Sequence, residues 1–187
     1  SIFDCDRAYL LHPCDPESPT WSVSMESNKP EYPGVLDFQS EVAMDPQIAE
    51  KFRIILAADG PVLFGPETRQ ELPEDVSKQF NIKSIMAMAI FPKTGSPWAF
   101  GIHQCSYTRR WTTVEKRIFE AIGRRLEDAL TSLLTYRNLQ RSEERYRLIA
   151  ENTADTISVF DFNLKPIYTS PSVQKLRGYT TDEALNQ

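Results

Sequence analysis

Two short motifs bring together residue types that bind metals. His12 and Cys14 lie two residues apart, and so do His103 and Cys105. In an extended strand, residues i and i+2 point to the same face, so each motif would present one imidazole and one thiol together. Nitrogen and sulfur are the ligands that zinc prefers. Zinc binding is therefore the first chemistry that this sequence must be tested for.

The cysteines could also support thiol chemistry. The chain has three, Cys5, Cys14 and Cys105, which form no Cys-x-x-Cys pair and leave one over. An odd number of separated cysteines favours a reducing, cytoplasmic setting over a secreted disulfide framework. A reactive thiol needs a lowered pKa and a resolving partner, whereas Asp4 and Asp6 flank Cys5 and would raise its pKa. We therefore expect no catalytic residues and no metal site.

Composition narrows the class of protein. The chain has 187 residues, of which 41% are hydrophobic and 25% charged, as in an ordinary globular protein. The net charge of -5 gives no electrostatic support for nucleic-acid binding. No apolar run approaches the roughly 18 to 20 residues that span a bilayer, and residues 1–4 do not read as a signal peptide. We expect no membrane segment.

Hydrophobic patterns predict the elements that must position these side chains. Strands are expected at residues 5–12, 21–25, 61–64, 83–91 and 98–105, and helices at residues 46–58 and 74–80. Pro46 after Asp45 is a typical helix start. The strand at 83–91 carries apolar side chains on both faces, so we expect it in the centre of a sheet. One face would then carry a helix, and the other face loops or a pocket.

A long amphipathic helix is predicted from Thr112 to about Glu151. Thr112 and Glu115 have the spacing of a capping box. Apolar residues then recur at the heptad spacing of a coiled coil, which favours a dimer seam formed by Phe119, Ile122, Leu126, Ala129, Leu133 and Tyr136. Forty residues at about 1.5 Å each would extend about 60 Å, further than one small domain. A single wide stripe that faces the chain's own core is the alternative.

The last part of the chain resembles the opening of a PAS domain. The run from Arg145 to Leu185 has a helix, a strand entered at Asp155-Thr156-Ile157, a hairpin after Phe160-Asp161, the segment from Tyr168 to Ser172, and Leu176-x-Gly178-Tyr179. These landmarks occur in the order and at the spacing of that family. They cover about the first half of a typical PAS domain.

Residues 1–140 resemble a GAF domain. The order of strand, hairpin, helix, strand, helix, hairpin and long helix matches that family, and residues 101–115 (GIHQCSYTRRWTTVE) are similar to its last strand and helix start in phytochrome-like sensors. The resemblance implies an α+β fold, with an antiparallel sheet flanked by helices, a long C-terminal coiled-coil helix and a partial PAS-like αββα start. The expected domains are 1–111, a GAF-like sensor without its first helix; 112–151, a signalling helix that begins on the sheet; and 152–187, an incomplete PAS-like start.

The two resemblances together imply a sensory input fragment of a bacterial signal-transduction protein. Such pairs are found in two-component sensor histidine kinases and in cyclic-di-nucleotide enzymes. We expect a cytoplasmic homodimer, joined through the long helix, with further PAS and transmitter domains downstream in the same protein. The fragment itself is not expected to be an enzyme. A signal in the GAF domain would pass through the helix as a shift between two states.

The GAF resemblance also bears on the possible sites. It sets the first and last strands side by side and antiparallel, so the two His-x-Cys motifs would lie about 20 Å apart, too far for one metal ion. Acidic loops at residues 26–44 and 65–75 disfavour an anionic ligand such as a cyclic nucleotide. No cofactor is evident, but an unknown small molecule could bind in the GAF pocket near His103, Gln104, Trp98 and Met88.

Two alternatives remain open. One is a photoreceptor-type GAF module that binds a bilin, although the segment 71–78, where such domains usually attach the pigment, has no cysteine. The other is a passive dimerisation spacer. In that case the chain's own side chains, such as Phe91, Trp98 and Met88, should fill the pocket.

Overall fold

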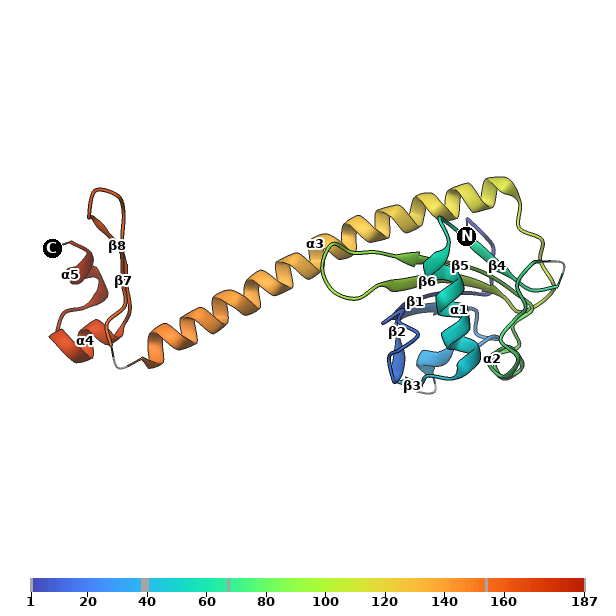
Figure 1. Cartoon of the computed structure of the whole chain (residues 1–187), viewed down its shortest axis with the longest axis horizontal. Helices are drawn as coiled ribbons and strands as arrows, with labels where there is room; N and C mark the ends of the chain where they lie inside the picture. Colours follow the sequence, from blue (N-terminus) through green and yellow to red (C-terminus); the bar gives the residue numbers. More distant parts are fainter. Residues whose placement is uncertain (1, 38–40, 67, 154, 187) are drawn as a thin grey trace. The chain divides into compact units, whose positions relative to one another are not determined.

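The computed structural model describes residues 2–37, 41–66, 68–153 and 155–186 (Figure 1). The chain divides into two compact units, Ser1–Leu133 and Leu134–Gln187. The long helix α3 (Thr113–Asn152) contributes to both units. No helix in the described ranges has both the length and the apolar character needed to cross a bilayer.

The first unit is built on a six-stranded antiparallel sheet. Its strands follow the spatial order β3 (Val42–Ala43), β2 (Thr20–Asn28), β1 (Arg7–His12), β6 (Trp98–Gln104), β5 (Ser84–Ile90) and β4 (Val62–Phe64). The first and last long strands, β1 and β6, are therefore adjacent and antiparallel, as predicted. The predicted α+β class with a GAF-like antiparallel sheet is confirmed.

Strand β5 is buried along its whole length, because both faces of the sheet are covered. Ile85 and Ala87 belong to one hydrophobic cluster, and Met86, Met88 and Ile90 belong to the other. This alternation is the one predicted for a central strand. The sheet therefore separates two distinct cores, one on each face.

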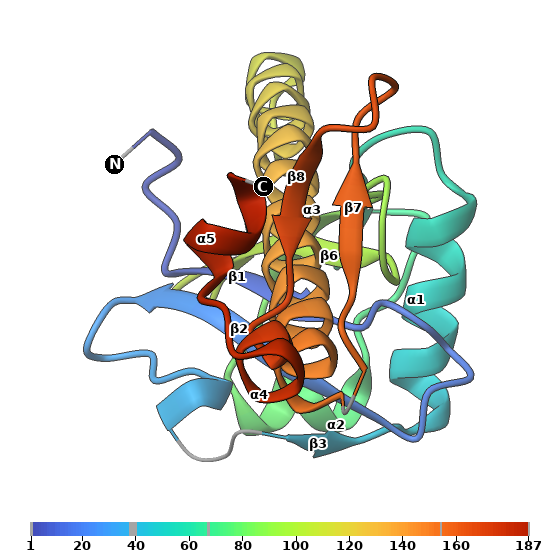
Figure 2. The same ribbon diagram turned by 90° about the vertical axis from the view of Figure 1, so that its left-hand side faces the viewer.

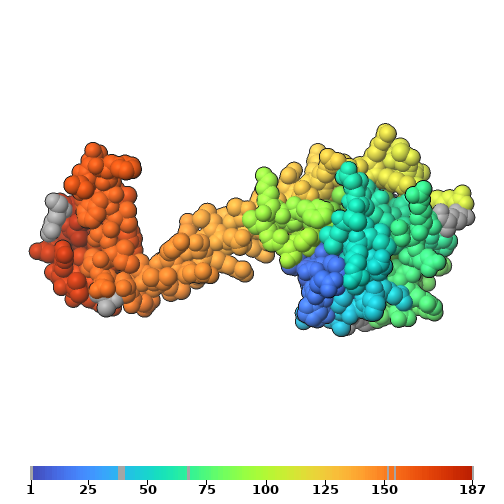
Figure 3. Space-filling view, in the orientation of Figure 1, coloured from blue at the N-terminus to red at the C-terminus, as the bar shows by residue number. Residues whose placement is uncertain are grey.

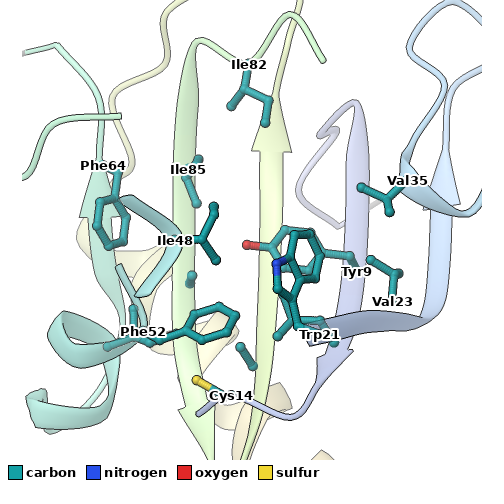
Figure 4. Packing of buried hydrophobic residues seen from close by; sticks show 14 of the residues in the cluster. Tyr9, Cys14, Trp21, Val23, Val35, Ile48, Phe52, Phe64, Ile82 and Ile85 are labelled. Atoms are coloured by element: carbon teal, nitrogen blue, oxygen red, sulfur yellow. The ribbon is translucent and has the colours of Figure 1, made fainter. Parts of the chain in front are cut away.

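Helices α1 (Pro46–Ala57) and α2 (Glu74–Gln79) and the short 3₁₀ helix η1 (Val35–Asp37) lie on one face of the sheet. Asp45 caps α1, because its carboxylate accepts hydrogen bonds from the backbone N–H groups of Gln47 and Ile48. Figure 4 shows Phe52 and Ile48 of α1 packed against Tyr9 and Trp21 from β1 and β2. Neither η1 nor the two-residue strand β3 was expected from the sequence.

The opposite face of the sheet is covered by the first part of α3. Phe119 is fully buried and stacks on Phe100 with ring centroids 4.4 Å apart. Gly123 allows close approach, because a Cβ atom at this position would lie 2.4 Å from the sulfur of Met88. Thr112 and Glu115 form the predicted capping box at the start of the helix.

The six residues proposed as a dimer seam do not share one environment. Phe119 lies in the core, and Ile122 and Leu126 pack against the same cluster, so these side chains cover their own sheet. The assignment of Phe119 to an intermolecular seam is therefore wrong, and the physical reason is that Phe100 and Phe3 enclose its ring. Ala129, Leu133 and Tyr136 are exposed, as is every residue from 135 to 141. Figure 3 draws this stretch of α3 in orange.

The second unit contains a β-hairpin followed by two short helices. Strands β7 (Ser158–Phe160) and β8 (Pro166–Thr169) pair antiparallel and precede α4 (Ser172–Arg177) and α5 (Thr181–Leu185) (Figure 2). These elements match the strands and helices predicted for this segment. Several apolar side chains of this unit are exposed, among them Phe160, Phe162 and Ile167.

Candidate functional site

A small cavity lies between the sheet and its α1–α2 cover. Its volume is about 30 Å³, enough for about two or three water molecules. Most of the lining is apolar, from strands β1, β2 and β5 and the two helices. The polar or charged residues that line it are Arg7, Tyr9, Trp21, Glu26, Lys51, Ser77 and His103.

Of the four predicted ligand-binding residues, the structure places only His103 on this cavity. Trp98 and Met88 pack against the cluster on the α3 side of the sheet. Gln104 is adjacent to His103 in sequence, so its side chain leaves the opposite face of β6. The assignment of Trp98, Met88 and Gln104 to the pocket is therefore wrong, because strand alternation sends all three side chains away from it.

Arg7 is the central charged group of the cavity. Its side chain is 2% exposed and donates hydrogen bonds to the backbone carbonyls of Tyr32 and Pro33, at 3.1 and 2.6 Å. Its Nε atom lies 3.6 Å from Oε1 of the buried Glu26. The guanidinium therefore joins β1 to β2 and to the loop that follows β2.

The contact between Arg7 and His103 fixes the tautomer of the imidazole. Nη1 of Arg7 lies 3.1 Å from Nδ1 of His103. A guanidinium can only donate, so Nδ1 accepts and Nε2 carries the proton. Burial lowers the pKa of His103 well below its ordinary value, and the positive charges of Lys51 and Arg7 lower it further. His103 is therefore neutral, with its Nε2–H as a free donor.

Lys51 projects from α1 into the same region. It is 8% exposed, and its ammonium group donates to the hydroxyl of Tyr9 at 3.2 Å. The group also lies over the rings of Tyr9 and Phe64, at 5.5 and 5.8 Å from their centroids. Among the described residues, no carboxylate forms an ion pair with it. Lys51 comes three residues after Ile48 on the apolar face of α1, a signal that the sequence already contained.

Four buried polar atoms on the cavity-lining residues have no hydrogen-bond partner within the described part of the chain. They are Nε of Arg7, Nε1 of Trp21, Oγ of Ser77 and Nε2 of His103. Leaving such groups unpaired costs about 1 to 3 kcal/mol each. Since most buried polar groups in proteins are paired, this concentration around one cavity indicates a place for a polar ligand or for water.

A second polar cluster lies at the same end of β1 and β6, on the opposite face. We call it the Asp6 network. The carboxylate of Asp6 accepts hydrogen bonds from Nε2 of Gln104 at 2.6 Å and from the backbone N–H groups of Cys105 and Ser106, both at 2.8 Å. Burial alone would raise the pKa of Asp6, but hydrogen bonds from Ser106, Lys29 and Cys105 together lower it far below its usual range.

The Asp6 network continues to the start of α3. The amide oxygen of Gln104 accepts a hydrogen bond from Nη1 of Arg109 at 2.9 Å. Arg109 also forms an ion pair with Glu115, the capping-box residue, and stacks over the ring of Trp111 at 4.4 Å. A continuous path of hydrogen bonds therefore connects β1 and β6 to the first turn of α3.

The cysteines do not form a reactive site. Burial raises the pKa of all three thiols, and raises that of Cys14 to about 12. Cys14 and Cys105 are fully buried in the core. Arg7 pairs with His103 in the β1–β6 register, so His12 lies at the far end of β1. No group of three potential metal ligands occurs among the residues that the structure describes.

The cavity also does not fit a bilin in this conformation. Pockets for drug-sized ligands measure roughly 300 to 1,000 Å³, about tenfold more than this cavity or above. Furthermore, none of the three cysteines lines it. An enlarged pocket and a different thiol geometry would both be needed before the chain could attach such a pigment.

Comparisons with solved structures identify the fold of the first unit. The GAF domain of Thermosynechococcus elongatus PixJ, in its blue-light absorbing form, is 16% identical, with a TM-score of 0.58 over 77% of this chain and 84% of that domain. A GAF domain of Synechocystis sp. PCC6803 in its photoproduct state is also 16% identical, with a TM-score of 0.57 over 74% of this chain and 90% of that domain.

A bacteriophytochrome of R. palustris is 15% identical, with a TM-score of 0.57 over 80% of this chain and 35% of that protein. No protein-family model matches the sequence, and neither does any curated protein. The first unit has the fold of a GAF domain. At these identities the likeness shows the fold and leaves the chemistry of the cavity to be argued from its own residues.

The neutral state of His103 predicts how stability depends on pH. The unfolded state binds a proton below its ordinary pKa of about 6.5, whereas the folded state does not. The free energy of unfolding should therefore decrease as the pH falls from about 6.5 to 5, by up to about 1.4 kcal/mol per pH unit for this residue. His103→Asn, whose amide oxygen can still accept from Arg7, should flatten that decrease.

Urea unfolding followed by circular dichroism at several pH values measures this slope. His12→Asn is the comparison variant. Burial also lowers the pKa of the half-buried His12, but less than that of His103, so His12→Asn should flatten the decrease less. A slope that His103→Asn leaves unchanged would show that His103 has the same pKa in the folded and unfolded states.

Proposed function

We propose that the first unit is a sensory module that binds a small molecule in the cavity and transmits this event to α3. The observation that carries the proposal is the set of unpartnered buried polar atoms around the cavity. A domain that served only as a spacer would gain stability by filling this space with apolar side chains. Phe91, Trp98 and Met88 do not fill it, since none of them lines it.

The proposed route of transmission uses neighbouring residues on opposite faces of the sheet. Arg7 and His103 face the cavity, whereas Asp6 and Gln104, next to them in sequence, belong to the Asp6 network. A ligand that shifts the ends of β1 and β6 would therefore change the hydrogen bonds that hold Arg109. Because Arg109 pairs with Glu115 at the helix start, the position of α3 would respond as a bias between two states.

We further propose that α3 relays this change to a PAS-like second unit, in a homodimeric bacterial sensor whose output is a histidine kinase. The support is the resemblance of residues 145–185 to the opening of a PAS domain, together with a 40-residue helix that links the two units. We also propose that this sensor is cytoplasmic. A cyclic-di-nucleotide enzyme as the output is the alternative. This chain itself would carry no catalytic step.

A photoreceptor-type GAF module is the second candidate function. It is favoured by the solved structures that share the fold, one of which contains bound biliverdin. The small cavity, with no cysteine on its lining, favours a small ligand instead. In this chain, bilin binding would require a conformational change that opens the α1–α2 cover.

Native mass spectrometry of the purified chain tests whether the cavity holds a ligand. We expect a bound small molecule on the wild-type chain and its loss in Val23→Leu, because Val23 lines the cavity and one added methylene would occupy the space. Val114→Leu, at an exposed position of α3, should retain the molecule. A bare wild-type mass would contradict the proposal, and an adduct at the mass of a tetrapyrrole after incubation with biliverdin would favour the photoreceptor.

Hydrogen exchange tests the route to α3. Arg109→Met removes the bond to Gln104 and the ion pair with Glu115, so the amides in the first turns of α3 should exchange roughly tenfold faster, as expected for lost charge-assisted bonds. Arg117→Met, on the exposed side of the same helix, should leave these rates unchanged. Equal rates in the wild type and Arg109→Met would show that the Asp6 network does not hold the helix start.

Analytical ultracentrifugation tests the proposed dimer. Leu133 is 44% exposed on α3, so Leu133→Glu should dissociate the dimer by burying a charge in an apolar seam. Ser132→Glu adds the same charge to the neighbouring exposed position and should remain dimeric. A wild-type chain that sediments as a monomer would contradict a homodimer held through this helix.

A further inference from the structure

The cavity has an excess of hydrogen-bond donors over acceptors. The unpartnered atoms Nε1 of Trp21 and Nε2 of His103 both carry hydrogen, and so does Nε of Arg7, whose nearest acceptor is Oε1 of Glu26 at the long distance of 3.6 Å. The assignment for His103 follows from its contact with Arg7, which occupies Nδ1. Ser77 adds a hydroxyl that can also donate. A ligand that satisfies these groups must therefore supply acceptor atoms.

Charge points in the same direction. Arg7 and Lys51 are cationic, His103 is neutral, and Glu26 is the one carboxylate that the described residues contribute to the lining. Glu26 lies beside Arg7 and also accepts a hydrogen bond from the backbone N–H of Leu36 at 3.0 Å. The ammonium of Lys51 thus remains without a carboxylate partner among the described residues. A buried charge without a counter-ion is costly, so the cavity is one negative charge short of neutrality.

The charged and polar groups form a continuous series. Lys51 contacts the hydroxyl of Tyr9, and the ring of Tyr9 lies 4.5 Å from the ring of His103, measured between centroids. His103 in turn contacts Arg7. The uncompensated ammonium and the imidazole that carries the unpartnered Nε2–H therefore both lie against the same tyrosine.

We propose that the cavity binds a small carboxylate, a monoanion of the size of formate or acetate. Its oxygens would accept from Lys51, His103 and Trp21, and its single charge would balance that of Lys51. The small volume excludes larger anions in this conformation, and the apolar remainder of the lining suits a hydrogen atom or a short alkyl group.

This proposal differs from the expectation from the sequence that an anionic ligand is disfavoured. That expectation rested on the acidic loops at residues 26–44 and 65–75, which were expected to lie at the rim of the pocket. The charges that line the interior come from strand β1 and helix α1 instead. Glu26, one of the acidic residues considered, is buried beside Arg7 and neutralises it.

The inference rests on the proposed sensory function, which places a ligand in this cavity, and it adds that the ligand is a small carboxylate. The indole N–H resonances of the three tryptophans provide the measurement, in ¹H–¹⁵N NMR spectra. Trp21 lines the cavity, whereas Trp98 and Trp111 pack on the α3 side and serve as internal references. Trp21→Phe assigns the resonance and removes one donor.

We expect sodium formate and sodium acetate, titrated at constant ionic strength against sodium chloride, to shift the Trp21 resonance in a saturable manner. Lys51→Met should weaken this binding by at least about tenfold, as expected for loss of a charged donor. Lys93→Met changes the net charge equally at an exposed position and should bind as the wild type does. Unshifted Trp98 and Trp111 resonances would show that Lys51→Met is folded.

Two outcomes would overturn the proposal. One is a Trp21 resonance that responds to formate and acetate no more than to chloride. The other is equal affinity in the wild type and Lys51→Met. A titration with acetamide, a neutral molecule of similar size, distinguishes a failure of the carboxylate proposal from a failure of the proposed ligand-binding function. Saturable binding of acetamide without binding of acetate would retain a ligand site and reject the anion, whereas a response to neither would remove support from both.

Discussion

The first unit depends on two adjacent buried charges, Asp6 just before β1 and Arg7 at its first position, which face opposite sides of the sheet. Arg7 faces the α1–α2 side, and Asp6 faces the α3 side. Burial of a charge is stabilising only where other groups supply hydrogen bonds or an opposite charge. Asp6 accepts hydrogen bonds from Gln104, Cys105 and Ser106, whereas Arg7 donates to backbone carbonyls and forms an ion pair with Glu26. Hydrogen bonds to these two charges therefore hold the start of β1 to its neighbours on both faces of the sheet.

This arrangement gives the domain a physical means of communication. Hydrogen bonds to buried charges tolerate only a narrow range of distances and angles. Movement of β1 by a fraction of an ångström on the cavity side would change bonds in the Asp6 network on the other side. The cost of leaving such a group unpaired is what would make α3 adjust its position in response.

The secondary structure was predictable because it depends on local signals. The apolar faces of residues 84–90, the Asp45–Pro46 helix start and the Thr112–Glu115 capping box each fix an element without long-range information. The site was predicted less well. Alternate residues of a strand face opposite sides of the sheet, so the sequence numbers alone place His103 on the face opposite to Trp98 and Gln104. The pairing of Arg7 with Glu26 and the isolation of Lys51 depend on contacts between distant segments, which no local pattern reveals.

The fold that unites this chain with bilin-binding domains does not determine its ligand. The structural neighbours place their sheet and helices alike, yet the chemistry of a pocket resides in the side chains that line it. Here Phe52, Trp21 and Phe80 occupy much of the space beside the sheet, and a charged remainder is left around Lys51. A large conjugated pigment gains affinity mainly from apolar area, whereas a small ion gains it from a few well-placed donors. The remaining cavity suits a small ion, because its unsatisfied groups are hydrogen-bond donors and its unbalanced charge is positive.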